Sequence, residues 1–348
     1  MGNKKNITGR EIINLLNKGE IPPRVPLVPV IYEHAAGLIG VNTSDLARNE
    51  DLIVKGQLAA YHLYKQDLVS VGVDIYNIEA EALGCKVTYF NDSSVPSISE
   101  PIISDIEDLR KLKVPNPAND GRMPLFISAT DRINEEIGKE VFVSGTVVGP
   151  FTLAAILRGF EPFMMDLITD EEFALEQLKF ASEVSFRYAK AFIDIGVGVA
   201  VNESWIAPPL LSPELFESVV FEFEQKLISR IKSYGIKNVA LICGGNTSSI
   251  ASLLVQTGTS LLIADSNSDQ AVIKKLCEQH KINLRASIDS ALVQSDNYDL
   301  LEEAVKNVIE KCSANGRFIF GCGIVSADTP VANVLKLKEL VDKYNPYK

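Results

Sequence analysis

The sequence predicts a single (β/α)₈ barrel domain over residues 1–348, with a short N-terminal helical extension. Eight short apolar runs alternate with longer amphipathic segments, and no linker or change in composition divides the chain. Several runs are almost continuously apolar and rich in β-branched residues, which is typical of parallel strands buried on both faces. A doubly wound open sheet is the alternative. It is disfavoured because no G-x-G-x-x-G motif follows the first run.

The extension begins at Thr8, which forms a capping box with Glu11 ahead of an apolar stretch. Helical periodicity covers 44–67, 170–194, 297–313 and 329–343. Ser212 followed by proline begins a further helix, and so does the polar run 246–248. We expect the polar segment 91–123 to be a long connection with one short helix. The predicted strands are 25–33, 73–81, 141–149, 197–205, 239–245, 260–266, 283–289 and 317–323.

Composition excludes several classes of protein. With 34 Lys and Arg against 45 Asp and Glu, the formal net charge is −11. An acidic surface repels nucleic acids and anionic lipids, and no apolar run reaches the roughly 18 residues of a membrane span. The five cysteines are few, odd in number and far apart. This pattern indicates a reducing cytoplasm and not a disulfide framework.

The active site of such a barrel forms where the carboxyl ends of the strands meet. Acids and thiols gather at these predicted ends, whereas the strand starts are apolar. The only tryptophan, Trp205, lies there too and either lines a pocket or packs in the core. The residues at these ends include Glu33, His34, Glu79, Glu81, Glu203, Trp205, Cys243, Asp265, Asp289 and Cys322.

Cys243 and Cys322 carry the most specific signal. Each follows an apolar strand and precedes a glycine, and both strands point into the same barrel mouth. Paired thiolates favour Zn²⁺, which would hold an incoming thiol as thiolate near neutral pH. Asp265 is the first candidate for a further ligand and Glu203 the second, and His34 is the only histidine at a strand end. The alternative is two buried cysteines without a metal.

Several segments resemble the uroporphyrinogen decarboxylase superfamily, and within it the zinc- and corrinoid-dependent methyltransferases. The resemblance covers nearly the whole chain and includes VPLVPVIYEHAAGLIG (25–40), VDIYNIEAEALGCKV (73–87), LICGGNT (241–247) and GCGI (321–324). It implies zinc ligands at Cys243 and Cys322, but the family histidine falls on Leu241. Asp265, Glu203, His34 or water would then complete the shell, or this member binds metal weakly.

The resemblance implies a corrinoid-dependent methyltransferase that works with a corrinoid protein carrying the cobalamin. A methyl group would pass from methylcobalamin to a zinc-bound thiol, or from a small methylated substrate to cob(I)alamin. Glu79, Glu203 and Asp289 are the expected catalytic residues, and Glu81 and Trp205 the expected corrinoid contacts.

Two other functions stay open. A decarboxylase is disfavoured because the family's catalytic aspartate falls near Ile75 and no arginine follows the first strand. A non-catalytic corrinoid-binding module is the third possibility.

Overall fold

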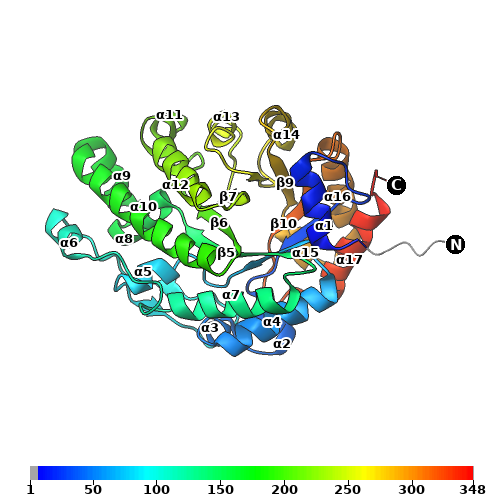
Figure 1. Ribbon diagram of the computed structural model, residues 1–348, viewed down its shortest axis with the longest axis horizontal. Coiled ribbons are helices and arrows are strands. Elements are labelled where there is room, and N and C mark those ends of the chain that lie inside the picture. Colours follow the sequence, from blue (N-terminus) through cyan, green and yellow to red (C-terminus); the bar gives the residue numbers. More distant parts are fainter. Residues whose placement is uncertain (1–6, 348) are drawn as a thin grey trace.

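The computed structural model describes residues 7–347, and its centre is one sheet of eight parallel strands that forms a nearly closed barrel (Figure 1). The predicted barrel and the N-terminal helix are confirmed. The strands follow one another in the order β1-β10-β9-β8-β7-β6-β5-β2. Their bounds are β1 Leu27–Val30, β2 Leu68–Val71, β5 Phe142–Val148, β6 Gly198–Glu203, β7 Val239–Cys243, β8 Leu261–Ala264, β9 Asn283–Ile288 and β10 Phe318–Ile324.

Closure between β1 and β2 depends on a side chain more than on a strand ladder. The Asp67 amide donates to the Leu27 carbonyl over 3.0 Å, and the Asp67 carboxylate accepts from the Leu27 amide over 2.8 Å. Arg24 forms an ion pair with the same carboxylate at 2.6 Å. Pro29 lies within β1 and has no amide hydrogen, so a regular ladder is interrupted at this seam.

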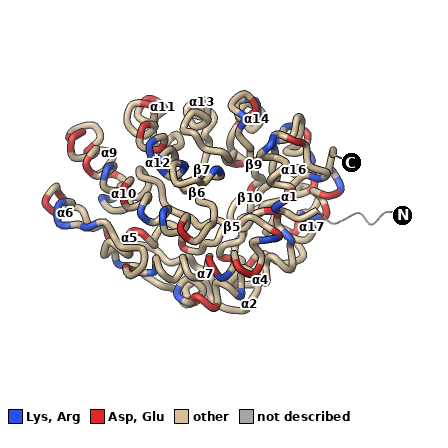
Figure 2. The backbone as a smooth tube through the Cα atoms, viewed as in Figure 1, with Lys and Arg blue, Asp and Glu red and all other residues tan. Residues whose placement is uncertain are grey.

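A ring of helices surrounds the sheet, and its charged residues of both signs are intermixed on the outside of the barrel (Figures 1 and 2). The longer helices are α4 Glu50–Tyr64, α7 Met123–Ile137, α8 Pro150–Arg158, α9 Phe160–Thr169, α10 Glu171–Asp194, α12 Phe221–Ser233, α14 Gln270–Gln279, α16 Tyr298–Cys312 and α17 Val331–Lys343. Shorter elements are α2 His34–Ile39, α3 Thr43–Leu46, α5 Ile78–Ala82, α6 Ile106–Lys111, α11 Pro213–Leu215, the π-helix Phe216–Val220, α13 Ala251–Leu254, α15 Ser290–Gln294, and the antiparallel pair β3 Val87–Thr88 and β4 Ser97–Ile98. Within residues 7–347, no helix is both long and apolar enough to cross a membrane.

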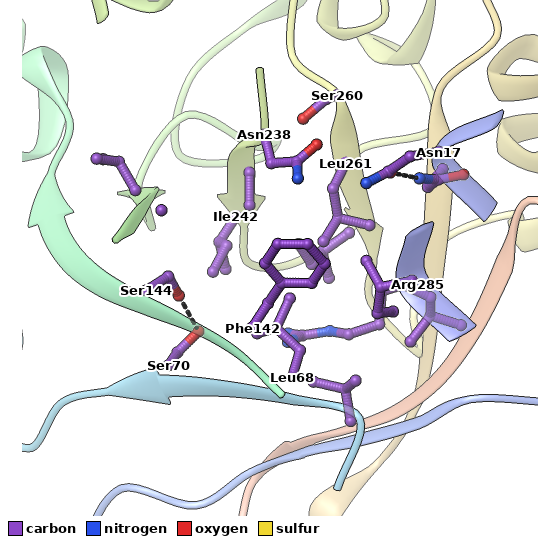
Figure 3. Close-up of a pocket in the computed structure, with 18 of the residues that line it drawn as sticks. Asn17, Leu68, Ser70, Phe142, Ser144, Asn238, Ile242, Ser260, Leu261 and Arg285 are labelled. Atoms are coloured by element: carbon purple, nitrogen blue, oxygen red, sulfur yellow. Dashed lines mark hydrogen bonds between the residues drawn. The ribbon is translucent and has the colours of Figure 1, made fainter. Parts of the chain in front are cut away.

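Helix α1, Gly9–Lys18, lies at the end of the barrel where the strands begin, and both halves of the predicted Thr8–Glu11 capping box are present. Its residues Ile13 and Asn17 line a cavity of about 60 Å³ inside the barrel (Figure 3). Asn283 of β9 donates to the Asn17 side chain over 2.8 Å. The helix therefore covers this end of the barrel, and the opposite end is left for a site.

The predicted second strand, 73–81, is wrong. Strand β2 is Leu68–Val71, and the chain turns away from the sheet through Asp74, which has a positive φ of 57°. The apolar residues of the predicted run, Val73, Ile75 and Ile78, are buried beneath the connection and the short helix α5. An apolar run of this length is equally consistent with a buried loop and short helix, so periodicity did not separate them. The other seven predicted strands overlap observed ones.

A smaller correction concerns the helix expected to begin at 246–248. Helix α13 begins at Ala251 instead. The side chain of Asn246 accepts hydrogen bonds from the amide and hydroxyl of Ser248, so it stabilises a turn and not a helix start.

Candidate functional site

A cleft of about 530 Å³ opens at the carboxyl ends of the strands, which is where a barrel enzyme places its site. It lies between the β1 and β2 connections, the N-terminal part of α8 and the end of β6. The segment 95–101, which includes β4, forms part of its lining. Among the described residues, the lining includes Glu33, Asp74, Tyr76, Asn77, Glu100, Thr152, Phe160, Ser204 and Trp205 and contains no Lys, Arg or His.

Glu33 is a buried carboxyl group in the lining of this cleft. It follows β1, and the residue is 7% exposed. One of its oxygens, Oε2, has no hydrogen-bond partner among residues 7–347. Burial raises the pKa of this carboxyl to about 7, and the nearby Asp74 raises the pKa as well. Glu33 is therefore a carboxyl group that a cationic ligand would keep ionised.

Asp74 is tied to a buried ion network behind the cleft. Arg122, at the start of α7, donates to Asp74 over 2.6 Å and to Glu81 over 2.5 Å. A third bond from Arg122 reaches the Ala47 carbonyl, and Tyr89 donates to Glu81. Glu81, expected to contact the corrinoid, thus accepts bonds from two side chains and is not part of the cleft lining.

Glu203 at the end of β6 holds the N-terminus of α8. Its buried carboxylate accepts from the Phe151 and Thr152 amides, each over 2.9 Å, and from the Thr152 hydroxyl. The same hydroxyl accepts from the Ser204 amide over 3.0 Å. These bonds fix the strand end from which the chain continues into Trp205.

Trp205 lines the cleft, which is one of the two settings that the sequence left open for it. Its ring makes an edge-to-face contact with Phe160, with 5.5 Å between the ring centroids. Tyr76 lies in the same cleft, and its hydroxyl accepts a hydrogen bond from Ser204. Three aromatic side chains therefore line one cavity, from α9, from the connection after β2 and from the end of β6.

Cys243 faces away from the barrel interior. The adjacent Ile242 lines the interior cavity, and successive residues of a strand point to opposite faces. The thiol is buried among helix residues, and the register pairs Cys243 with Glu203. Burial raises the pKa of this thiol, and the charges of Glu224 on α12 and of Glu203 add to the increase. Leu241, at the position of the family histidine, lies on the same outer face.

Cys322 faces outward as well. A side chain at Gly321 would point toward Arg285 and Ser287 inside the barrel, so the next residue points to the helix layer. Burial raises the pKa of the Cys322 thiol to about 11. The Asp265 carboxylate accepts from the Gly245 amide over 3.0 Å and holds the connection after β7.

The structure does not bring the predicted zinc donors together. Cys243 and Cys322 lie on strands separated by β8 and β9, both face the helices, and Glu203 is engaged by α8. In the described part of the chain, no group of three or more His, Cys, Asp or Glu side chains is placed to hold a metal ion. The residues present therefore do not fit a zinc centre.

The remaining candidates lie outside the cleft lining. Glu79 on α5 is fully buried, accepts from the Val148 amide over 2.7 Å, and has its pKa raised to about 8 by burial. Asp289 is exposed and caps α15 through the Ala291 amide. His34 is buried between the Ser326 carbonyl and the Tyr64 hydroxyl, at 3.0 and 2.7 Å.

Several residues that shape the site were missed by sequence reasoning. Asp74 and Tyr76 fell inside the misplaced second strand, and Arg122 lies in the polar segment taken as a connection. Glu224 lies on a helix, where its 0% exposure is not visible from the periodic pattern. Glu33 and Trp205, in contrast, were found from the sequence, because each lies at the end of a predicted strand.

Comparison with known proteins agrees with this architecture. The family model "Uroporphyrinogen decarboxylase (URO-D)" matches residues 9–344. The methylcobamide:CoM methyltransferase MtbA of Methanosarcina acetivorans is 29% identical over 281 residues, which is 80% of each chain. A uroporphyrinogen decarboxylase of a Wolbachia species is 26% identical over 85% of this chain and 83% of its own.

Among solved structures, a methyltransferase from Methanosarcina mazei superposes with a TM-score of 0.85. It is 23% identical and the match covers 97% of this chain and 99% of that one, so it supports the fold. The barrel, the position of its cleft and the match over residues 9–344 lead to one conclusion: this chain belongs to the uroporphyrinogen decarboxylase (URO-D) family.

Proposed function

We propose that this chain is an enzyme that transfers a methyl group between a small substrate and a corrinoid carried by a partner protein. The observation that carries the proposal is the relation to methylcobamide:CoM methyltransferases over 80% of both chains. The cleft at the barrel mouth supports it, because its size suits a small organic substrate.

The chain's own residues bind and orient the substrate in this proposal. Trp205, Phe160 and Tyr76 supply apolar contact, and Glu33 supplies a buried carboxyl group in the same lining. Glu203 and Thr152 act as positioning residues, because their hydrogen bonds fix the end of β6 against α8. Glu79, Glu81 and Asp289 are structural residues in this proposal and do not touch the substrate.

The proposal assigns no step to zinc, because among the described residues no three of the predicted donors come together. Of the two directions, demethylation of a methylated substrate is therefore preferred over activation of a thiol. Decarboxylation of a polycarboxylate is disfavoured, since such a substrate needs cationic partners and no Lys, Arg or His lines the cleft among the described residues.

The test follows the spectrum of free cobalamin in place of the carrier protein. Cob(I)alamin is mixed with the enzyme and a panel of methylated amines, ethers and thioethers, and in the reverse arm methylcobalamin is mixed with thiols. We expect methylcobalamin to form from at least one donor, and the rate to fall at least about tenfold in Trp205→Ala. Glu135→Gln, an exposed change on α7, is the matched control. Absence of conversion in both directions would overturn the proposal, and binding of cobalamin without turnover would favour a non-catalytic module.

A further inference from the structure

The walls of the cleft have a chemistry that the family relation does not specify. Three aromatic side chains line it: Tyr76, Phe160 and Trp205. Aromatic faces carry negative electrostatic potential and attract cations, and groups of such rings recognise quaternary ammonium ions. An apolar substrate would also fit these rings, so the charge of the remaining lining decides between the two.

That charge is negative. Glu33, Asp74 and Glu100 line the cleft, and no basic side chain of the described chain lines it. Asp74 already forms an ion pair with Arg122 at 2.6 Å, and Glu100 is exposed. Glu33 differs from both, because it is more than nine-tenths buried and its Oε2 lacks a hydrogen-bond partner within residues 7–347.

A buried carboxyl with an unpaired oxygen is costly unless something in the cleft compensates it. A quaternary ammonium group has no hydrogen to donate, so it does not need the directed acceptors that a primary amine needs. It gains from a carboxylate at one side and from aromatic faces at the others. An anionic ligand would instead meet Glu33, and none of the described lining residues is a cation that could balance it.

We propose that the cleft binds a quaternary ammonium head group, and that this group is the methyl donor. The inference rests on the proposed function and names its substrate class. Glu33 supplies the counter-charge, and Trp205, Phe160 and Tyr76 supply the aromatic contacts.

The chemistry balances without an acid. The C–N bond breaks with its electron pair left on nitrogen, which departs as a neutral tertiary amine. The electron pair of the partner's Co(I) corrinoid forms the new Co–C bond, and cobalt becomes formally Co(III). No proton is transferred, so neither a metal nor a protonated side chain has to activate the leaving group.

The test uses Trp205 as its reporter, since it is the only tryptophan and lines the cleft. Tetramethylammonium chloride is titrated into the full chain at pH 8, above the pKa of Glu33. Tryptophan emission is recorded at constant ionic strength. tert-Butanol serves as the neutral probe of similar shape, and 2-mercaptoethanesulfonate as the anionic thiol. We expect a saturable change with tetramethylammonium and none with the other two in the same range.

Two variants test the named contacts. Glu33→Gln keeps the shape and is expected to raise the Kd for tetramethylammonium about tenfold, and Phe160→Leu about threefold to tenfold. Glu135→Gln, outside the cleft, is expected to leave the Kd unchanged. Near-ultraviolet circular dichroism of each variant reports whether it is folded. Equal Kd values for wild type and both folded cleft variants, or tighter binding of the sulfonate, would overturn the assignment.

The two proposals fail separately, because this titration contains no corrinoid. Saturable binding of tetramethylammonium with no methyl transfer to cob(I)alamin would leave the ligand class standing and refute the transfer. Methyl transfer from a neutral or anionic donor, with no binding of tetramethylammonium, would support the transfer and refute the ligand class.

Discussion

The buried carboxyl of Glu79 gives a stability difference that depends on pH and can be calculated. The side chain is fully buried, Oε1 accepts from the Val148 amide over 2.7 Å, and Oε2 has no partner among the described residues. Burial raises the pKa from 4.5 to about 8. The folded protein therefore keeps this proton to higher pH than the unfolded chain does. Its contribution to stability falls as pH rises from about 4.5, and the loss is complete above about 8.

The size of the effect follows from the shift. Each pKa unit corresponds to about 1.4 kcal/mol, so the full loss is about 5 kcal/mol, of which about 3.5 kcal/mol falls between pH 5 and pH 8. Glu79→Gln keeps the acceptor for Val148 but cannot ionise. We expect the free energy of unfolding of Glu79→Gln, relative to wild type, to rise by about 3.5 kcal/mol between pH 5 and pH 8. The other buried acids are common to both proteins and cancel in the difference.

The assay is urea unfolding at pH 5, 6, 7 and 8, followed by circular dichroism. Glu135→Gln is the control, because this residue is exposed on α7, and its profile should run parallel to wild type. If the curves for Glu79→Gln and wild type are parallel across this range, the carboxyl is not held neutral by burial and the reasoning is refuted.

Three further predictions concern other buried groups. Arg122→Met should lower the free energy of unfolding by about 3–5 kcal/mol, because its two carboxylate partners are left without a cation, and a variant as stable as wild type would contradict this network. After zinc is added to the chain and removed by dialysis, metal analysis should find well below one equivalent of bound zinc, in wild type and in Cys243→Ser alike. Stoichiometric zinc that is lost in both Cys243→Ser and Cys322→Ser would contradict this, because both sulfurs would then bind one ion. Arg285→Met should raise the free energy of unfolding by about 1–3 kcal/mol and so raise the thermal midpoint. The residue is 6% exposed inside the barrel, and no carboxylate of residues 7–347 forms an ion pair with its guanidinium (Figure 3). A lower midpoint would reveal a compensating partner.

Glu203 was found from the sequence as a candidate site residue, but in the structure its carboxylate binds the start of α8. Its place at the end of a strand was evident, and the apolar run before it fixed β6 to within two residues. The strand end, however, faces the start of α8, whose unpaired amides bind a carboxylate. Sequence spacing gives no information on which neighbouring helix start a strand end will meet.

The two cysteines show that the sequence likewise does not determine the direction in which a side chain at a strand end points. Their positions after apolar runs identified the strand ends, and their burial was expected for this residue type. Whether each thiol points into the barrel or toward the helices depends on the register of its strand, and a shift of one residue reverses it. That register is set by pairing with neighbouring strands, Glu203 with Cys243 and Cys322 with Ile288.

The sequence by itself determined the barrel, seven of its strands, the capped N-terminal helix and the end of the barrel where polar residues collect. These features depend on local hydrophobic periodicity, caps and the handed connection of parallel strands, all of which are contained in short segments. Only the tertiary structure decided that Glu33 and Trp205 share one cleft while Cys243 and Cys322 face away from each other. Convergence of side chains distant in the chain depends on strand register and on helix docking, because these set the direction in which each side chain points.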